Sequence, residues 1–217
     1  MNTSTMATIL GTTALGLLKS KGSNAKWGYT SFEPKNLMDI FNASENYRLG
    51  CNELILDEVN YNFEGLEKII SMFPNIDSLS IQYANITTIP SNISTLTNLK
   101  KLFAGDSAIE SIPPEIGQCV NLEEVYLAGC RLTSIPSEIC NLVKLKILYV
   151  DWNDLESIPF CILKLPQLSH LNIAGNNNLS IEKPDALTLR RLSQKFNPST
   201  FRRIIRKMKE SSDLRRF

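Results

Sequence analysis

A short phrase built around Ile-Pro returns at a constant interval along this chain of 217 residues. ITTIPSNI, IESIPPEI, LTSIPSEI and LESIPFCI place their prolines at positions 90, 113, 136 and 159, a step of 23 residues each time. A fixed period of this length is typical of repeat architectures, in which one unit cannot bury its apolar face alone and neighbouring units must stack. The period therefore restricts the chain to a solenoid of similar coils.

Stacking the chain in this period aligns its apolar residues in columns. Four full units run from Asn75 to Pro166, a truncated unit ends near Glu182, and a divergent copy begins at Cys51. The alternating apolar pair in each unit predicts a short strand with one buried face, and the later isoleucines predict a return leg that faces the same core. Proline keeps that leg extended, because it fixes φ and holds the preceding residue out of the helical region. The first column contains Cys51, Ile76, Leu99, Leu122, Leu145 and Leu168.

These units resemble the leucine-rich repeat family, in its 23-residue version with Ile-Pro or Leu-Pro in the return leg, as in Ras-suppressor-like, plant intracellular and many bacterial members. The resemblance covers residues 51–182, with about six copies. It implies an α/β repeat fold: a leucine-rich repeat solenoid with a concave parallel β-sheet, an irregular convex side and helical caps at both ends. The family usually has Asn, sometimes Cys, at the ninth position, where it bonds to the backbone of adjacent turns. Only the last three residues of that column fit, so we expect looser early turns; the column is Val59, Ala84, Ser107, Cys130, Asn153 and Asn176.

The resemblance divides the chain into an N-terminal leader and helical cap (1–50), the repeats (51–182) and a basic C-terminal helical cap (183–217). Upstream, Leu37, Ile40 and Phe41 behind Pro34 predict a short helix. Downstream, the segment 185–196 predicts a helix that contributes Leu187, Leu189 and Leu192 to the cap. Asn197 is the expected N-cap of a last helix with Pro198 at its first position. Its apolar stripe is Phe201, Ile204, Ile205 and Met208.

The last 35 residues carry eleven basic and three acidic side chains, whereas residues 1–182 carry twelve basic and nineteen acidic ones. A basic amphipathic helix can lie on anionic lipid or contact nucleic acid. The alternative is a cap whose basic face is solvated and partly compensated by the acidic body. The basic residues that would make a weak lipid or nucleic-acid contact are Arg202, Arg203, Arg206 and Lys207.

Five cysteines without a Cys-x-x-Cys spacing indicate inert buried thiols in a reducing compartment. We therefore expect a cytoplasmic protein, or one delivered into a host cell if it is a bacterial effector. Residues 6–18 are mildly apolar but too short to span a bilayer, and they lack a basic segment before them. They are expected to form a frayed or weakly helical leader, with an atypical export signal or a membrane contact as the alternative.

Enzyme signatures are missing from the sequence, including the phosphate-binding glycine loops, G-x-S-x-G and H-E-x-x-H. The single histidine, His170, falls in a strand column that faces outward, so a surface histidine is favoured over a catalytic base. We expect no catalytic residues, no metal site and no cofactor.

One outward column carries three aromatic residues in successive coils: Phe103, Tyr126 and Tyr149. Strand pairing would bring them about 4.8 Å apart, with Tyr83 and Trp152 in the loops just beyond. Exposed aromatics rimmed by charge favour a protein interface, whereas cross-strand stacking alone would stabilise the sheet. The charged and polar neighbours predicted to set specificity are Lys101, Glu124, Asp151 and His170.

The sequence thus predicts a monomeric, non-enzymatic module that binds an unidentified protein on its concave face. A signalling adaptor or scaffold and a secreted bacterial effector are both compatible with it. The alternative is a protein that docks to anionic membrane or nucleic acid through its basic C-terminal helix.

Overall fold

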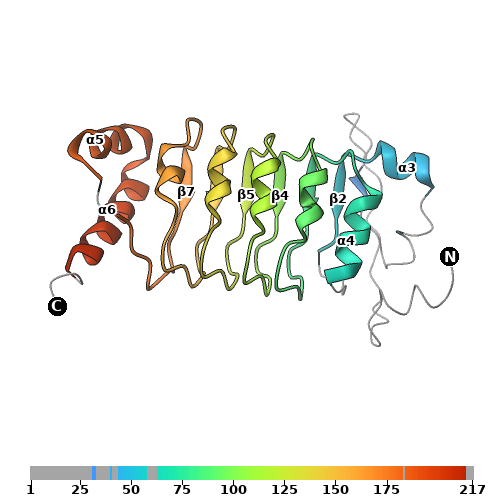
Figure 1. Ribbon diagram of the computed structural model, residues 1–217, viewed down its shortest axis with the longest axis horizontal. Coiled ribbons are helices and arrows are strands. Elements are labelled where there is room, and N and C mark those ends of the chain that lie inside the picture. The colour runs from blue at the N-terminus through green and yellow to red at the C-terminus, as the bar shows by residue number, and fades with distance from the viewer. Residues whose placement is uncertain (1–30, 33–39, 41–43, 58–62, 183, 214–217) are drawn as a thin grey trace.

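The computed structural model describes residues 31–32, 40, 44–57, 63–182 and 184–213. These residues form a row of stacked coils around a parallel sheet of seven strands in the order β1-β2-β3-β4-β5-β6-β7 (Figure 1). The strands are β1 (Ser31–Phe32), β2 (Glu53–Ile55), β3 (Ser78–Ser80), β4 (Lys101–Phe103), β5 (Glu124–Tyr126), β6 (Ile147–Tyr149) and β7 (His170–Asn172). Six of them come from the predicted units, and β1 is an additional strand that the repeat pattern does not contain.

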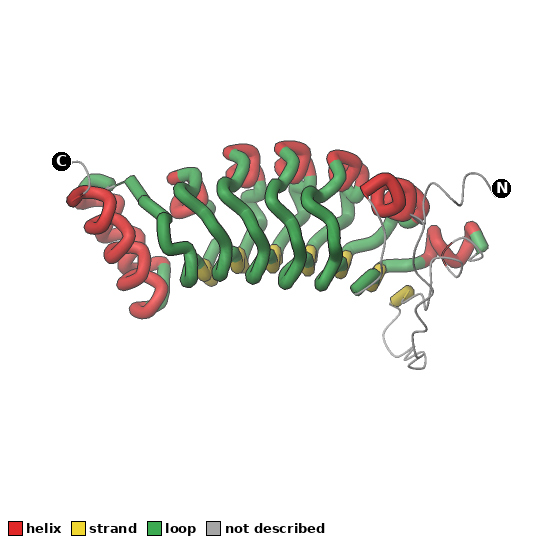
Figure 2. Tube along the Cα trace, turned by 90° about the horizontal axis from the view of Figure 1, so that it is seen from below, coloured by secondary structure: helices red, strands yellow, loops and turns green. Residues whose placement is uncertain are grey.

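The register of the sheet follows the period of the sequence. Leu102 of β4 pairs with Val125 of β5, which pairs with Leu148 of β6, so residues 23 positions apart are neighbours. The return legs lie on the opposite side from the strands, where short helices form a second layer (Figure 2). The helices are α3 (Glu45–Gly50), α4 (Phe63–Met72), η1 (Ser91–Thr95), η2 (Pro114–Gln118), η3 (Ser137–Asn141), η4 (Phe160–Lys164), α5 (Ala186–Lys195) and α6 (Pro198–Asp213), of which the η elements are 3₁₀ helices.

Each repeated proline marks the point where the return leg turns into one of these helices. Pro90, Pro113 and Pro136 keep extended backbone angles, and each caps the 3₁₀ helix that follows. The carbonyl of Pro113, for example, accepts a hydrogen bond from Ile116 N–H at 3.1 Å. Proline therefore ends the extended leg, and the convex side is an ordered row of short helices rather than an irregular surface.

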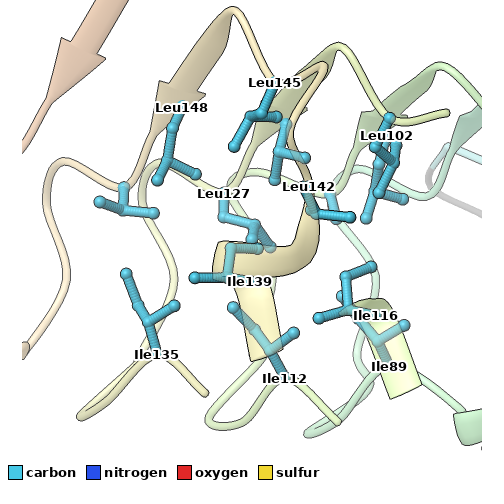
Figure 3. Packing of buried hydrophobic residues seen from close by; sticks show 14 of the residues in the cluster. Ile89, Leu102, Ile112, Ile116, Leu127, Ile135, Ile139, Leu142, Leu145 and Leu148 are labelled. Atoms are coloured by element: carbon cyan, nitrogen blue, oxygen red, sulfur yellow. The ribbon is translucent and has the colours of Figure 1, made fainter. Parts of the chain in front are cut away.

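The core lies between the strands and the return legs. Leucines from the strands and isoleucines from the 3₁₀ helices point into the same interior, as Leu102, Leu148, Ile116 and Ile139 show (Figure 3). These four side chains are at most 1% exposed. The predicted apolar columns are thus the core of the protein, and burial of their side chains drives the stacking of the coils.

A ladder of polar side chains at the ninth repeat position supports the turns from the inside. Asn153 Nδ2 donates to the carbonyl of Leu127 at 2.7 Å, and its Oδ1 accepts from Leu132 N–H at 2.9 Å. Ser107 continues the ladder one coil earlier than predicted, because its hydroxyl accepts from Ala84 N–H at 3.1 Å and donates to the Gly105 carbonyl at 3.0 Å. Val59 lies outside the described residues.

Two helices close the C-terminal end of the stack. Asn197 Oδ1 accepts from Thr200 N–H at 2.9 Å and so caps α6, as predicted. Ile204 and Met208 of α6 are buried. The prediction that Leu187 belongs to the buried side of α5 is wrong: this residue is 59% exposed, because it lies on the face opposite Leu192. At the N-terminal end Ile40 is helical and buried, whereas Pro34, Leu37 and Phe41 lie outside the described residues.

The prediction of five free thiols is also wrong. Cys140 of η3 and Cys161 of η4 form a disulfide, with a Cα–Cα distance of 5.8 Å that suits such a bond. The two cysteines meet because adjacent coils place η3 beside η4. Cys51, Cys119 and Cys130 are buried thiols outside this disulfide, as expected for small apolar positions in the core.

Candidate protein-binding site

The aromatic column forms a continuous strip on the outer face of the sheet. The rings of Phe103 and Tyr126 stack with centroids 4.9 Å apart, and Tyr126 meets Tyr149 edge-on at 5.3 Å. All three side chains are half-buried. The residue that directly precedes each of them in its strand points into the core. We call Phe103, Tyr126 and Tyr149 the aromatic strip.

A charged pair supports the middle of the strip. The Tyr126 hydroxyl donates to Glu124 Oε2 at 3.0 Å, and Lys101 Nζ lies 3.2 Å from Glu124 Oε1. Burial, followed by the hydrogen bond to Glu124, raises the pKa of Tyr126 to about 12. Glu124 therefore orients the central ring and helps to keep its hydroxyl protonated well above neutral pH. The arrangement also leaves Lys101 neutralised rather than available as a lone positive charge.

The loop residues just beyond the strands share an uncommon backbone conformation. Tyr83, Asp106 and Trp152 have φ angles of 57°, 51° and 54°, and Gly129 and Gly175 occupy the same repeat position with 68° and 71°. Residues other than glycine rarely adopt this left-handed backbone region. Backbone strain of this kind concentrates at functional sites. The two aromatic residues at this loop position are largely exposed: Tyr83 is 56% and Trp152 69% exposed.

Gly175, at the equivalent position of the next coil, lets the Trp152 ring lie against the backbone there. A Cβ on Gly175 would come within 2.8 Å of the Trp152 ring. The indole is thus supported by the backbone on one face while most of its surface meets solvent. Trp152 follows Tyr149 by three residues in the same coil, and Tyr83 lies three coils earlier; among the described residues, neither ring contacts the strip.

Asp151 is an acidic residue beside the strip, and its charge is poorly compensated. Its Oδ1 is shielded from solvent and, among the described residues, has no hydrogen-bond partner. Desolvation raises the pKa of Asp151, the field of Asp106 acts in the same direction, and its own backbone N–H and Arg203 oppose them. The equivalent positions of the two preceding coils are Gly105 and Ala128, so Asp151 is the charged member of a column of small residues.

The C-terminal helix reaches the same face of the sheet. Arg203 of α6 donates from Nη1 to Asn172 Oδ1 at 2.6 Å, and Asn172 belongs to the aromatic column. Sequence reasoning assigned Arg203 to a solvated basic surface and missed this contact, because the angle at which α6 packs on β7 is not encoded in the repeat. Of the other residues predicted for the basic surface, Arg202 and Arg206 are exposed. Lys207 Nζ donates to the Asn177 carbonyl at 3.1 Å.

His170 lies at the exposed edge of β7. Its Nδ1 is 2.9 Å from the hydroxyl of the adjacent Ser169. Within the described part of the chain, no carboxylate bonds to the other ring nitrogen, so the pair lacks the third group that orients a catalytic base. The geometry places His170 on the rim of the candidate surface rather than in a reactive constellation.

Other kinds of site find little support in the described ranges. No three His, Cys, Asp or Glu side chains gather there in a way that could hold a metal ion. Nor does any helix among these residues have the length and apolarity to cross a membrane. An open groove of about 570 Å³ lies away from the strip, among the loops before the prolines; it is lined by Thr87, Thr88, Glu110, Ser111, Arg131 and Thr133.

Comparison with known proteins agrees with the coil geometry. Residues 120–179 match the family model for the leucine rich repeat. Residues 120–179 are therefore leucine-rich repeats, and the fold of the whole stack is that of a leucine-rich repeat solenoid. No curated protein matches the sequence.

Solved structures show the same architecture in longer proteins. A leucine-rich repeat protein of Leptospira interrogans has a TM-score of 0.58 and 26% identity, over 70% of this chain and 37% of its own. The ectodomain of the Arabidopsis thaliana receptor kinase GASSHO1/SCHENGEN3, solved with CASPARIAN STRIP INTEGRITY FACTOR 2, has a TM-score of 0.55 and 23% identity, over 66% and 17%. The Arabidopsis receptor kinase HAESA, solved with the peptide hormone IDA and the co-receptor SERK1, has a TM-score of 0.55 and 20% identity, over 70% and 26%. This chain thus spans well under half the length of each.

Proposed function

We propose that the protein is a non-enzymatic, monomeric module that binds a protein partner through the aromatic strip and Trp152. The observation that carries the proposal is the unbroken line of half-exposed rings on one face of a rigid sheet. Aromatic side chains of this kind often supply the dominant contacts of an interface. The plant receptor kinase HAESA, which shares the fold, was solved in complex with a peptide hormone and a co-receptor, and this supports the choice of a protein as the partner.

The alternative, that the rings of the aromatic strip serve only to stabilise the sheet, does not account for the exposed indole of Trp152. Trp152 lies in a strained backbone conformation with 69% of its surface in solvent, so its placement contributes little burial. A partner that covers Trp152 would bury the remaining apolar area. The adaptor and the effector roles share this mechanism, because both need only a rigid surface of matched shape.

Docking through the basic C-terminal helix has weaker support. Ile204 and Met208, the apolar side chains that would enter a membrane, are buried against the end of the solenoid. Arg203 is bonded to Asn172. The helix therefore uses its apolar side as a cap, and the proposal assigns no lipid or nucleic-acid binding to it.

The location of the protein is a proposal as well. The expectation of a cytoplasmic protein depended on five free thiols, and the Cys140–Cys161 disulfide removes that premise. Such bonds persist in oxidising compartments. The bridge favours a site of action outside the reducing cytoplasm, which gel mobility with and without reductant would test on protein isolated from its own cells.

Affinity capture with two matched variants tests the binding surface. Phe103→Ala/Tyr126→Ala/Tyr149→Ala should lose the partners that the wild type retains. Val120→Ala/Val143→Ala, which removes two exposed apolar side chains from turns remote from the strip, should retain them; these valines are 50% and 51% exposed. Circular dichroism must show that both variants are folded. An identical set of partners for all three proteins would refute the proposal.

A further inference from the structure

We infer that the partner presents a basic side chain, Lys or Arg, on a short extended segment that lies along the aromatic strip, with the cation beside Asp151. This inference rests on the proposed function and specifies the chemistry of the partner. It is carried by the charge balance of the surface, by the position of Asp151, and by the rings around it.

The charge balance of this face is acidic, because the carboxylates of Asp106 and Asp151 outnumber Arg203, the cation that α6 brings to it. Lys101 is neutralised by Glu124 at 3.2 Å, so this pair contributes no net charge. Asp106 and Asp151 form no ion pair with any residue that the structure describes. A partner with an acidic segment would therefore meet repulsion along the strip, whereas a basic segment would be attracted.

The Asp151 carboxylate is only partly compensated, by its own backbone N–H and by the field of Arg203. One of its oxygens is both shielded from water and without a hydrogen-bond donor. A buried acceptor without a donor is unfavourable and needs an explanation. Because Oδ1 is shielded, an ammonium or guanidinium group of a partner would compensate the charge of this carboxylate by its field and not by a bond to Oδ1.

The repeat positions next to Asp151 in the preceding coil carry small residues. Ala128 occupies the equivalent position one coil earlier, and Gly129 follows it in the loop. The Asp106 carboxylate lies over Gly129, where any Cβ would collide with it. Asp106 acts on Asp151 through its field, so a cation near Asp151 would be attracted by both carboxylates.

The surrounding rings suit a cation on an apolar stem. Tyr149 directly precedes the Val150–Asp151 pair, and Trp152 follows it with most of its indole exposed. The faces of Tyr and Trp attract Lys and Arg, and more strongly when water is excluded. The strip from Phe103 to Tyr149 is about 10 Å long, from centroid steps of 4.9 and 5.3 Å. About three residues of extended chain cover that length.

Arg203 provides an internal competitor. Its guanidinium bonds to Asn172, one coil beyond Asp151, and its field lowers the pKa of Asp151 against the effect of burial. The same positive charge repels an incoming cation. Removal of the charge at position 203 should therefore strengthen binding of a basic segment, and removal of the charge at position 151 should weaken it.

A selection from a display library of random 12-residue peptides tests the inference. The wild-type protein is the bait, and the Phe103→Ala/Tyr126→Ala/Tyr149→Ala variant removes peptides that bind elsewhere. Enriched peptides should contain Lys and Arg more often than the naive library. Two of them, made synthetically and labelled, are then titrated against two single variants by fluorescence polarisation.

Asp151→Asn should weaken binding about tenfold, as expected for loss of a charge-assisted contact. Arg203→Gln, which keeps a donor for Asn172, should tighten it by about two- to fivefold. Enriched peptides without a basic excess, or equal affinity for wild type and Asp151→Asn, would overturn the inference and leave the proposed function standing. Recovery of no peptide that depends on the strip would also overturn it, because it commits to a short segment; the capture experiment decides the proposed function separately.

Discussion

The disulfide between Cys140 and Cys161 makes a stability prediction that no other part of the fold would mimic. It links η3 to η4 on the convex side and closes a loop with a sequence separation of 21 residues. Reduction of the bond leaves the sheet and the core columns untouched. Its effect should therefore appear in the free energy of unfolding rather than in the native circular dichroism spectrum.

The magnitude follows from the loop that the bond closes. In the chain-entropy model, a cross-link over 21 residues removes enough freedom from the unfolded chain to stabilise the fold by about 3 kcal/mol at 25 °C. Free energies of folding are about 5–15 kcal/mol for ordinary domains. Reduction should therefore remove a large part of the stability without unfolding the protein at room temperature.

Urea unfolding with and without a phosphine reductant measures this difference. The Cys140→Ser/Cys161→Ser variant should unfold at the midpoint of the reduced wild type and should not respond to reductant. The three cysteines outside the disulfide provide the internal control, since they are buried and stay reduced in both forms. A thiol titration of the unfolded, unreduced protein that finds five free thiols, or a midpoint that ignores reductant, would refute the reasoning.

Three further predictions concern the ladder and the strip. Asn153→Ala should destabilise the protein by about 3 kcal/mol, since it leaves buried backbone groups unpaired; Ser107→Ala should lose only about 1 kcal/mol, and equal urea midpoints would contradict this. Ser107→Asn should raise the midpoint by extending the amide ladder. The raised pKa of Tyr126, about 12, means that its neutral form stabilises the fold below pH 10 and that this contribution is lost as pH rises toward 12. Absorbance titration at 295 nm should show this late ionisation, and Glu124→Gln should bring it earlier.

The parts of the structure that repeat every 23 residues could be predicted from the sequence. The alignment of Phe103, Tyr126 and Tyr149 follows directly, because the strands pair in register and the period of the coil equals the period of the sequence. The left-handed loop position was predictable too, since Gly129 and Gly175 recur in one column. Tyr83 and Trp152 share that column, and this signal was overlooked.

Contacts that cross the period could not be predicted in the same way. Cys140 and Cys161 are 21 residues apart, so they belong to different columns and meet on a diagonal between two short helices. The contact between Arg203 and Asn172 depends on how α6 packs against the last strand. The 23-residue period predicts contacts between residues at the same position in successive coils. These two pairs join residues at different positions, so the period does not predict them.

The chemistry of the five cysteines explains why an odd number need not lead to mispairing. Burial raises the pKa of Cys119 to about 11, and burial also raises the pKa of Cys130, so neither thiol forms the reactive thiolate near neutral pH. Their sulfurs donate instead to carbonyl oxygens of the preceding coils. Only Cys140 and Cys161 are half-buried on the convex side, where an oxidant can reach them. The folded coils therefore leave one pair within reach of an oxidant, and the core shields the remaining thiols.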